Sequence, residues 1–144
     1  MSDQSRAEAY VDKSKHQYYE KMRNDANSVF YKNDYTEIFV AAAAVGYHYR
    51  KKEPIKGSKQ SIAVLSLISS NSPKLWILKA IAVSVKGIEV LGNLKEVASA
   101  VEDYANAGID ILFNSHDNTE DELYSMAYNL MEIIETEVID QQSS

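Results

Sequence analysis

The sequence contains no cysteine, and among its 144 residues it has only two prolines and five glycines. Without cysteine, the chain can form no disulfide bond, no thiolate metal site and no cysteine nucleophile. Because proline and glycine are the strongest helix breakers, their scarcity favours long helices. No continuous run of about 20 apolar residues occurs, since polar residues such as Asn71 and Lys74 interrupt the most hydrophobic stretch, residues 62–85. We therefore expect no transmembrane helix.

An export signal is also missing, because the first 15 residues are polar, mixed in charge and without an apolar run. Together with the absence of cysteine, this predicts a cytoplasmic protein. A length of 144 residues is sufficient for one domain with its own core, and no repeat or linker divides the chain. We expect a single helical domain over residues 1–144, with a frayed tail at residues 140–144.

Lysine and arginine are missing from the C-terminal part, where 12 acidic residues occur from Glu96 onward. Residues 1–60 contain 11 basic and 8 acidic residues, a balance of +3, and residues 61–144 contain 4 and 13, a balance of −9. The simplest interpretation is a solvated acidic face that keeps the protein soluble. The alternatives are a bipolar surface that docks partners or packs head to tail, and an acidic surface that mimics DNA.

The spacing of apolar residues predicts helices through most of the chain. A first helix is expected over residues 6–23, and a second begins at Asn33 or Asp34, which suit an N-cap. Further helices are expected from Pro73, over residues 94–113 and from Thr119 to Val138, with a short helix or buried connector over residues 62–68. These elements predict an all-α fold, a single compact bundle of five to six helices.

Small residues indicate where two helices approach each other closely. The four alanines Ala41–Ala44 leave a thin surface on the second predicted helix. Gly108 lies inside the helix predicted over residues 94–113, where a glycine costs about 1 kcal/mol relative to alanine. We therefore expect either that a neighbouring helix packs against Gly108 or that the helix bends there.

Motifs of catalysis and of cofactor binding are absent from the sequence. The chain has neither a glycine-rich phosphate loop nor a G-x-S-x-G serine motif. His16, His48 and His116 are far apart, and no two lie four residues apart as paired metal ligands on a helix would. We expect no catalytic residue, no metal site and no cofactor, and hence a protein that is not an enzyme.

Aromatic and basic residues concentrate in the N-terminal half, where seven of the ten tyrosines precede Arg50. Such a mixture suits contacts to the phosphates and bases of nucleic acid, and it equally suits a protein interface. A third interpretation is that the tyrosines fill the core with their hydroxyl groups at its rim. The candidate residues for binding protein or nucleic acid are Tyr47, His48, Tyr49, Arg50, Lys51, Lys52, Lys56 and Lys59.

Two stretches of the sequence carry a resemblance to a known family. The first is residues 33–55, NDYTEIFVAAAAVGYHYRKKEPI, and the second is residues 101–110, VEDYANAGID. In content and order they resemble the DNA phosphorothioation (Dnd) system-associated protein 4 family, small proteins encoded beside the DNA phosphorothioation genes. Residues 58–93 carry no part of this resemblance.

The resemblance implies a role beside DNA sulfur modification or a linked anti-phage defence system, and it supplies no catalytic residues. We expect a non-catalytic accessory protein that binds proteins of that system, with DNA and a second copy of the chain as further partners and no membrane. One alternative is a DNA-binding or regulatory protein that uses residues 47–59. The other is an acidic DNA-mimic inhibitor that uses the residues from Glu96 onward.

Overall fold

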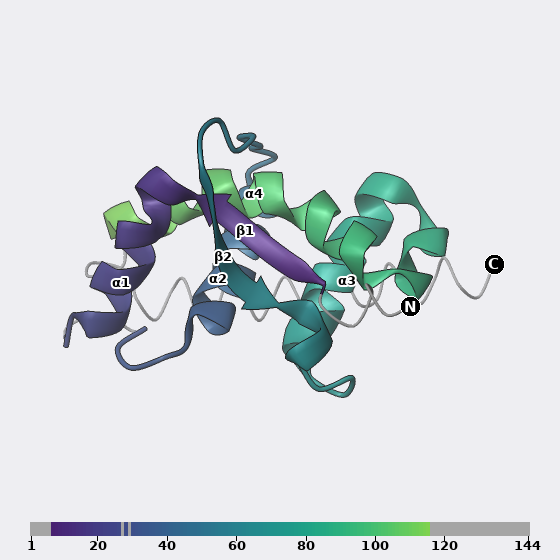
Figure 1. The fold of residues 1–144 in the computed structure, drawn as a ribbon, viewed down its shortest axis with the longest axis horizontal. Helices are drawn as coiled ribbons and strands as arrows, with labels where there is room; N and C mark the ends of the chain where they lie inside the picture. The colour runs from purple at the N-terminus through teal and green to yellow at the C-terminus, as the bar shows by residue number, and fades with distance from the viewer. Residues whose placement is uncertain (1–6, 27, 29, 116–144) are drawn as a thin grey trace.

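The computed structural model describes residues 7–26, 28 and 30–115, which form four helices and one pair of antiparallel strands. In chain order the elements are β1 (Glu8–Asp12), α1 (His16–Asn24), α2 (Tyr35–His48), β2 (Lys59–Val64), α3 (Pro73–Lys86) and α4 (Leu94–Ser115). Short 3-10 helices occupy residues 13–15, 65–67 and 88–92. Figure 1 shows α4 running along the length of the described part, with the two strands lying across it and α1 and α3 toward its opposite ends.

The prediction of an all-α bundle of five to six helices is wrong, because the described fold mixes helices with a two-stranded antiparallel sheet. The α-helix predicted over residues 6–23 begins only at His16, since residues 8–12 form β1 and residues 13–15 form a 3-10 helix. In β1, Ala9 and Val11 are buried while their neighbours are partly exposed, which is the alternation of a strand covered on one face. Five residues are too few to separate this period from that of a helix.

The second strand, β2, replaces part of the short helix or connector predicted over residues 62–68, and only residues 65–67 form a 3-10 helix. Ala9 pairs with Ala63 and Tyr10 pairs with Ser61. Ile62 is therefore an extra residue in β2, a β-bulge, which bends the strand locally. The paired residues are far apart in the sequence, so local periodicity gives no sign of their contact.

The remaining helices begin where the sequence predicts. Asp34 caps α2 by accepting a hydrogen bond from the backbone N–H of Glu37, and Ser72 caps α3 in its first turn. The last predicted helix and the tail fall in residues 116–144, which lie outside the described residues. Among the described helices, none combines the length and apolar character needed to cross a bilayer.

The backbones of α2 and α4 touch at the centre of the core. A Cβ atom on Gly46 would lie 2.0 Å from the carbonyl oxygen of Tyr104, and one on Gly108 would lie 1.8 Å from that of Ala42. Both distances are too short for any real contact, so the helices approach this closely only because these two residues have no side chain. The expectation that a helix packs against Gly108 is confirmed, and the alanines of residues 41–44 are all buried.

Replacing Gly108 with alanine tests this contact. The added methyl group meets backbone atoms of Ala42, which cannot rotate away, so we expect the free energy of unfolding to fall by about 3 kcal/mol or more. Urea denaturation measures the change. Gly92→Ala is the matched control, because nothing lies within 4 Å of a Cβ atom there, and it should shift stability by less than about 0.5 kcal/mol. Equal stability of the two variants would contradict the close helix contact.

Candidate binding surface after helix α2

Helix α2 ends in a turn that places a basic residue in the left-handed backbone conformation. The backbone N–H of Arg50 donates to the carbonyl oxygen of Tyr47 at 3.1 Å, and that of Lys51 donates to Gly46 at 2.9 Å. These two bonds are those of a Schellman C-cap. Arg50 has a φ of 56°, which costs a non-glycine residue about 1–2 kcal/mol. Glycine is the usual residue at this position.

Most of the predicted binding residues are exposed in this part of the chain, residues 47–59, which we call the basic segment. Tyr47 is buried, whereas Tyr49 is 51% exposed. The other exposed members are His48, Arg50, Lys51, Lys52, Lys56 and Lys59. Seven of the eight predicted residues are thus accessible to a partner, and Tyr47 belongs to the core instead. Its hydroxyl group forms a hydrogen bond with Ser84 of α3 at 2.6 Å.

Three cations of the basic segment lie over tyrosine rings of the same chain. From cationic group to ring centroid, the pairs are Arg50–Tyr47 at 4.3 Å, Lys52–Tyr104 at 5.1 Å and Lys59–Tyr10 at 4.1 Å. Such cation–π contacts hold the charged groups above the ring faces. These ring faces are therefore already covered, and they are not open for stacking against the bases of a nucleic acid.

A buried amide joins the middle of the basic segment to β1 and α4. The Asn106 side chain, from α4, donates to the carbonyl oxygens of Glu53 at 2.9 Å and Pro54 at 3.4 Å. Its Oδ1 atom accepts from the backbone N–H of Asp12 at 3.2 Å. Asn106 is only 1% exposed, so each of these bonds replaces one that water would otherwise make. One side chain thus holds three backbone groups in place.

Lys15 is the second connection, and its side chain is also buried. Its ammonium group donates to the carbonyl oxygen of Asn106 and forms ion pairs with Glu53 and Asp110, all at 2.8 Å. Burial alone would lower the pKa of Lys15, but the hydrogen bonds to Asp110 and Glu53 outweigh it and raise that pKa. The stabilisation is therefore complete below pH 10.5, the ordinary lysine pKa, and is lost only as the pH rises through the raised value.

Two further carboxylates, those of Asp12 and Glu102, accept hydrogen bonds from the backbone of the basic segment and of β1. Asp12 accepts from the hydroxyl group and the backbone N–H of Ser14 and from the backbone N–H of Lys56, and these bonds lower the pKa of Asp12. Glu102 accepts from the backbone N–H of Tyr10 at 2.9 Å, while burial raises the pKa of its carboxyl group. Both carboxylates serve internal contacts, and the exposed charge of the basic segment is positive.

The acidic residues from Glu96 onward fall only partly within the described residues. There, Glu102 bonds to the backbone of β1 and Asp110 bonds to Lys15, so these two do not contribute to an exposed acidic stripe. Eight of the twelve acidic residues lie in residues 116–144, outside the part that the structure describes. The DNA-mimic alternative therefore stays a prediction.

Sequence reasoning did not identify the residues that fix the basic segment, namely Asp12, Lys15, Glu53 and Asn106. A signal for Asn106 was available, because a polar amide between alanines on the apolar face of a helix is costly unless it is hydrogen-bonded. No comparable signal marked Lys15. Over the described ranges, no three His, Asp or Glu side chains converge as a metal site requires.

A comparison with known protein families identifies the family of this chain. The family model of DNA sulphur modification system-associated protein 4 matches residues 10–143. The chain belongs to this family, and the resemblance carried by residues 33–55 and 101–110 is confirmed. In the fold these two stretches meet, since α2 packs against α4 and Asn106 bonds to Glu53. Neither the comparison with curated proteins nor that with solved structures gave a match.

Replacing Asn106 with alanine should destabilise the protein by about 2–3 kcal/mol, because it leaves partly buried backbone groups of Asp12 and Glu53 without the bonds that Asn106 makes to them. Chemical denaturation measures this loss. Asn114→Ala on the same helix is the control, since Asn114 is exposed and its loss should change stability by less than about 0.5 kcal/mol. Similar values for both variants would show that the Asn106 bonds contribute nothing.

Replacing Arg50 with glycine should have the opposite effect on stability. Glycine adopts the left-handed conformation without strain, and this gain exceeds the lost cation–π contact with Tyr47, so we expect a stabilisation of about 0.5–1 kcal/mol. Thermal denaturation at two salt concentrations measures it. A destabilised Arg50→Gly protein would mean that the arginine is kept for its contacts within the fold.

Proposed function

We propose that the protein is a non-catalytic accessory protein of a DNA sulphur modification system or of a defence system linked to it, and that it contacts DNA phosphates through the basic segment. The observation that carries this proposal is Arg50, a cation held where a glycine would be less strained. A strained residue that persists is a reason to look for function at that position, and Arg50 differs from the equally strained Lys32 in that Lys51 and Lys52 follow it as exposed cations. Family membership supplies the biological system.

The fixed geometry of the basic segment supports phosphate binding. Because Asn106 and Lys15 hold residues 53–54 against β1 and α4, the chain here has little conformational freedom left to lose on binding. Lysine and arginine side chains bind DNA mainly by neutralising phosphates and releasing counterions. Since the rings of Tyr47, Tyr104 and Tyr10 lie under cations of this chain, contact with the sugar–phosphate backbone fits better than base stacking.

A protein partner is the second candidate, and Tyr49 favours it. Its ring is about half exposed, contacts the ring of His48 edge to face at 4.8 Å and lies next to Arg50. Tyrosine and arginine are the residues most enriched at the energetic centres of protein interfaces. Such an interface would use the same segment and would depend more on Tyr49 than on the three consecutive cations.

Fluorescence anisotropy with a labelled DNA duplex, plain and phosphorothioated, over a series of salt concentrations tests the proposal. We expect affinity that falls steeply with salt. The triple variant R50A, K51A and K52A should lower the slope of log K against log salt concentration by about 3, because each lost phosphate contact removes about one unit. A difference between the two duplexes would show that the sulfur atom is recognised.

The matched control removes three exposed lysines elsewhere, in the variant K21A, K32A and K95A. It changes the net charge equally, and Lys32 also has a left-handed backbone, with a φ of 64°, so it matches Arg50. This control should keep most of the affinity. Equal losses in both variants would indicate binding to net charge alone. Flat anisotropy at low salt would refute the DNA contact, and a Tyr49→Ala pull-down with proteins encoded beside this chain would then test the protein interface.

A further inference from the structure

The end of β1 brings a lysine from the N-terminal part of the chain beside the basic segment. The backbone N–H of Lys13 donates to the carbonyl oxygen of Ser58 at 2.9 Å, and Asp12 lies opposite Lys59 in the sheet. The Asp12 carboxylate also accepts from the backbone N–H of Lys56 at 3.1 Å. The two stretches therefore lie directly against each other, although Asp12 and Lys56 are 44 positions apart in the sequence.

This contact gathers three exposed lysines at one end of the sheet, which we call the sheet-end cluster: Lys13, Lys56 and Lys59. Lys13 and Lys56 form no ion pair with another residue that the structure describes. The ammonium group of Lys59 lies over the Tyr10 ring at 4.1 Å, a contact that holds it in place without neutralising its charge. The cluster is therefore a positively charged surface to which β1 and β2 both contribute.

A second group of cations, the helix-end cluster, consists of Arg50, Lys51 and Lys52 at the end of α2. The chain between α2 and β2 projects as a loop beyond the two strands, as Figure 1 shows. Asn106 holds the middle of this loop through its bonds to residues 53–54. The two clusters thus lie toward opposite ends of one loop, and the fold fixes their positions relative to each other.

We infer that the protein contacts one DNA duplex at two places, with phosphates bound by the helix-end cluster and by the sheet-end cluster. This inference rests on the proposed DNA contact and adds to it Lys13, a residue outside the basic segment. Phosphate contacts fix the register and orientation of a protein on a duplex. Once one cluster has bound, the other is already close to the same duplex, so the second contact forms at high effective concentration.

Two carboxylates near the sheet-end cluster are occupied by contacts within the chain. Asp12 lies beside the lysines, and its oxygens accept three hydrogen bonds from neighbouring residues. Glu102 interacts electrostatically with Lys59, but its carboxyl group is partly buried and accepts from the backbone of β1. Lys13 and Lys56 have no such acidic partner among the described residues, so they provide most of the outward positive charge.

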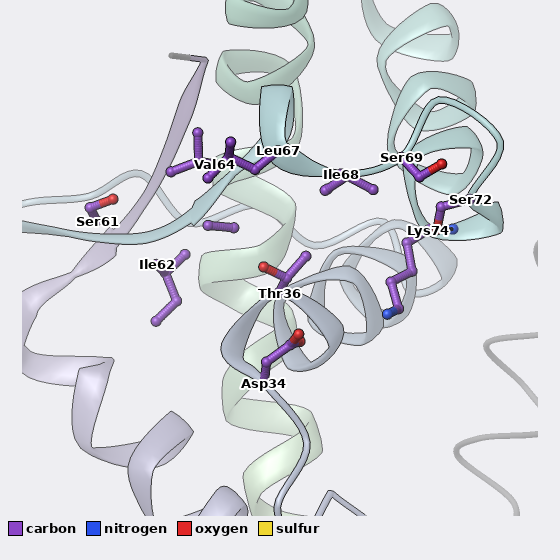
Figure 2. Close-up of a pocket in the computed structure, with 11 residues that line it drawn as sticks. Asp34, Thr36, Ser61, Ile62, Val64, Leu67, Ile68, Ser69, Ser72 and Lys74 are labelled. Carbon is purple, nitrogen blue, oxygen red and sulfur yellow. Dashed lines mark hydrogen bonds between the residues drawn. The ribbon is translucent and has the colours of Figure 1, made fainter. Parts of the chain in front are cut away.

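The other end of β2 does not suit phosphate. A pocket of about 600 Å³ borders residues 61–64 there (Figure 2). The carboxylate of Asp34 lines it, and Lys74, which also lines it, forms an ion pair with Glu37 at 3.3 Å. A phosphate would therefore meet an acidic side chain and a lysine whose charge is already balanced. We expect DNA to leave this end of the strand untouched, so its residues serve as an internal reference.

Fluorescence anisotropy with the full chain and the plain duplex, over a salt series, tests the inference. The sheet-end variant K13A, K56A and K59A should lower the slope of log K against log salt concentration by about 3, as the helix-end variant R50A, K51A and K52A does. All six substitutions together should lower it by about 5–6, because the two clusters bind separate phosphates. The variant K21A, K32A and K95A is again the matched control, and circular dichroism checks that each variant folds.

Lys13 has a test of its own, because it is the residue that this inference adds. Lys13→Ala should lower the slope by about one unit, whereas Lys13→Arg keeps the charge and should leave the slope unchanged. In a titration with the same duplex followed by NMR, the backbone amide signals of Lys13 and Ser58 should shift together with that of Lys51. The amide signal of Val64, which lines the pocket, should stay in place.

The outcomes separate this inference from the proposed function. If only the helix-end variant lowers the slope and the Lys13 amide signal stays in place, the proposed DNA contact stands and the two-place contact is overturned. If only the sheet-end variant lowers it, the helix-end contact is wrong, and the duplex is again bound at one place. Equal losses in the control variant, or no binding at low salt, overturn the two-place contact together with the proposed function.

Discussion

The contact between the backbones of α2 and α4 is the constraint on which the rest of the structure depends. Gly46 and Gly108 let the two helices touch. Asn106 lies half a turn before Gly108 on α4, and this short separation brings its amide within reach of the carbonyl of Glu53, where the chain has just left α2. A side chain on either glycine would push the helices apart and remove these bonds together. The close contact between α2 and α4 therefore determines both the packing of the core and the position of the basic segment.

The parts of the fold that the sequence predicted correctly are those with a local cause. Asp34 and Ser72 each bond to the first turn of their own helix, and such capping patterns are visible within a few residues. The strands have no local cause, since Tyr10 is a strand residue only because Ser61 lies opposite it. Residues 13–24 are helical. The spacing of apolar residues that predicts this helix continues into residues 8–12, so the prediction wrongly included β1.

The candidate surface divides in the same way. That Arg50, Lys51 and Lys52 are exposed follows from their charge and from the end of the helix. The sequence does not predict which of Tyr47 and Tyr49 is buried. Tyr47 is buried because the fold places Ser84 and Tyr104 beside it. A lone lysine such as Lys15 is expected in solvent, and only the tertiary fold brings two carboxylates to it.

The long reach of these contacts has a consequence for how the protein is made. Lys15 and Asn106 are 91 positions apart in the sequence. During synthesis, the cations of residues 50–59 leave the ribosome well before the residue that fixes them, and a growing chain folds only as its partners emerge. The charged residues are thus synthesised early, but they reach their final positions only after residue 106 has been synthesised. An incomplete chain that stops before residue 106 contains the basic residues but lacks the contacts that hold them in position. The ordered surface can therefore form only in a chain that has been translated at least through α4.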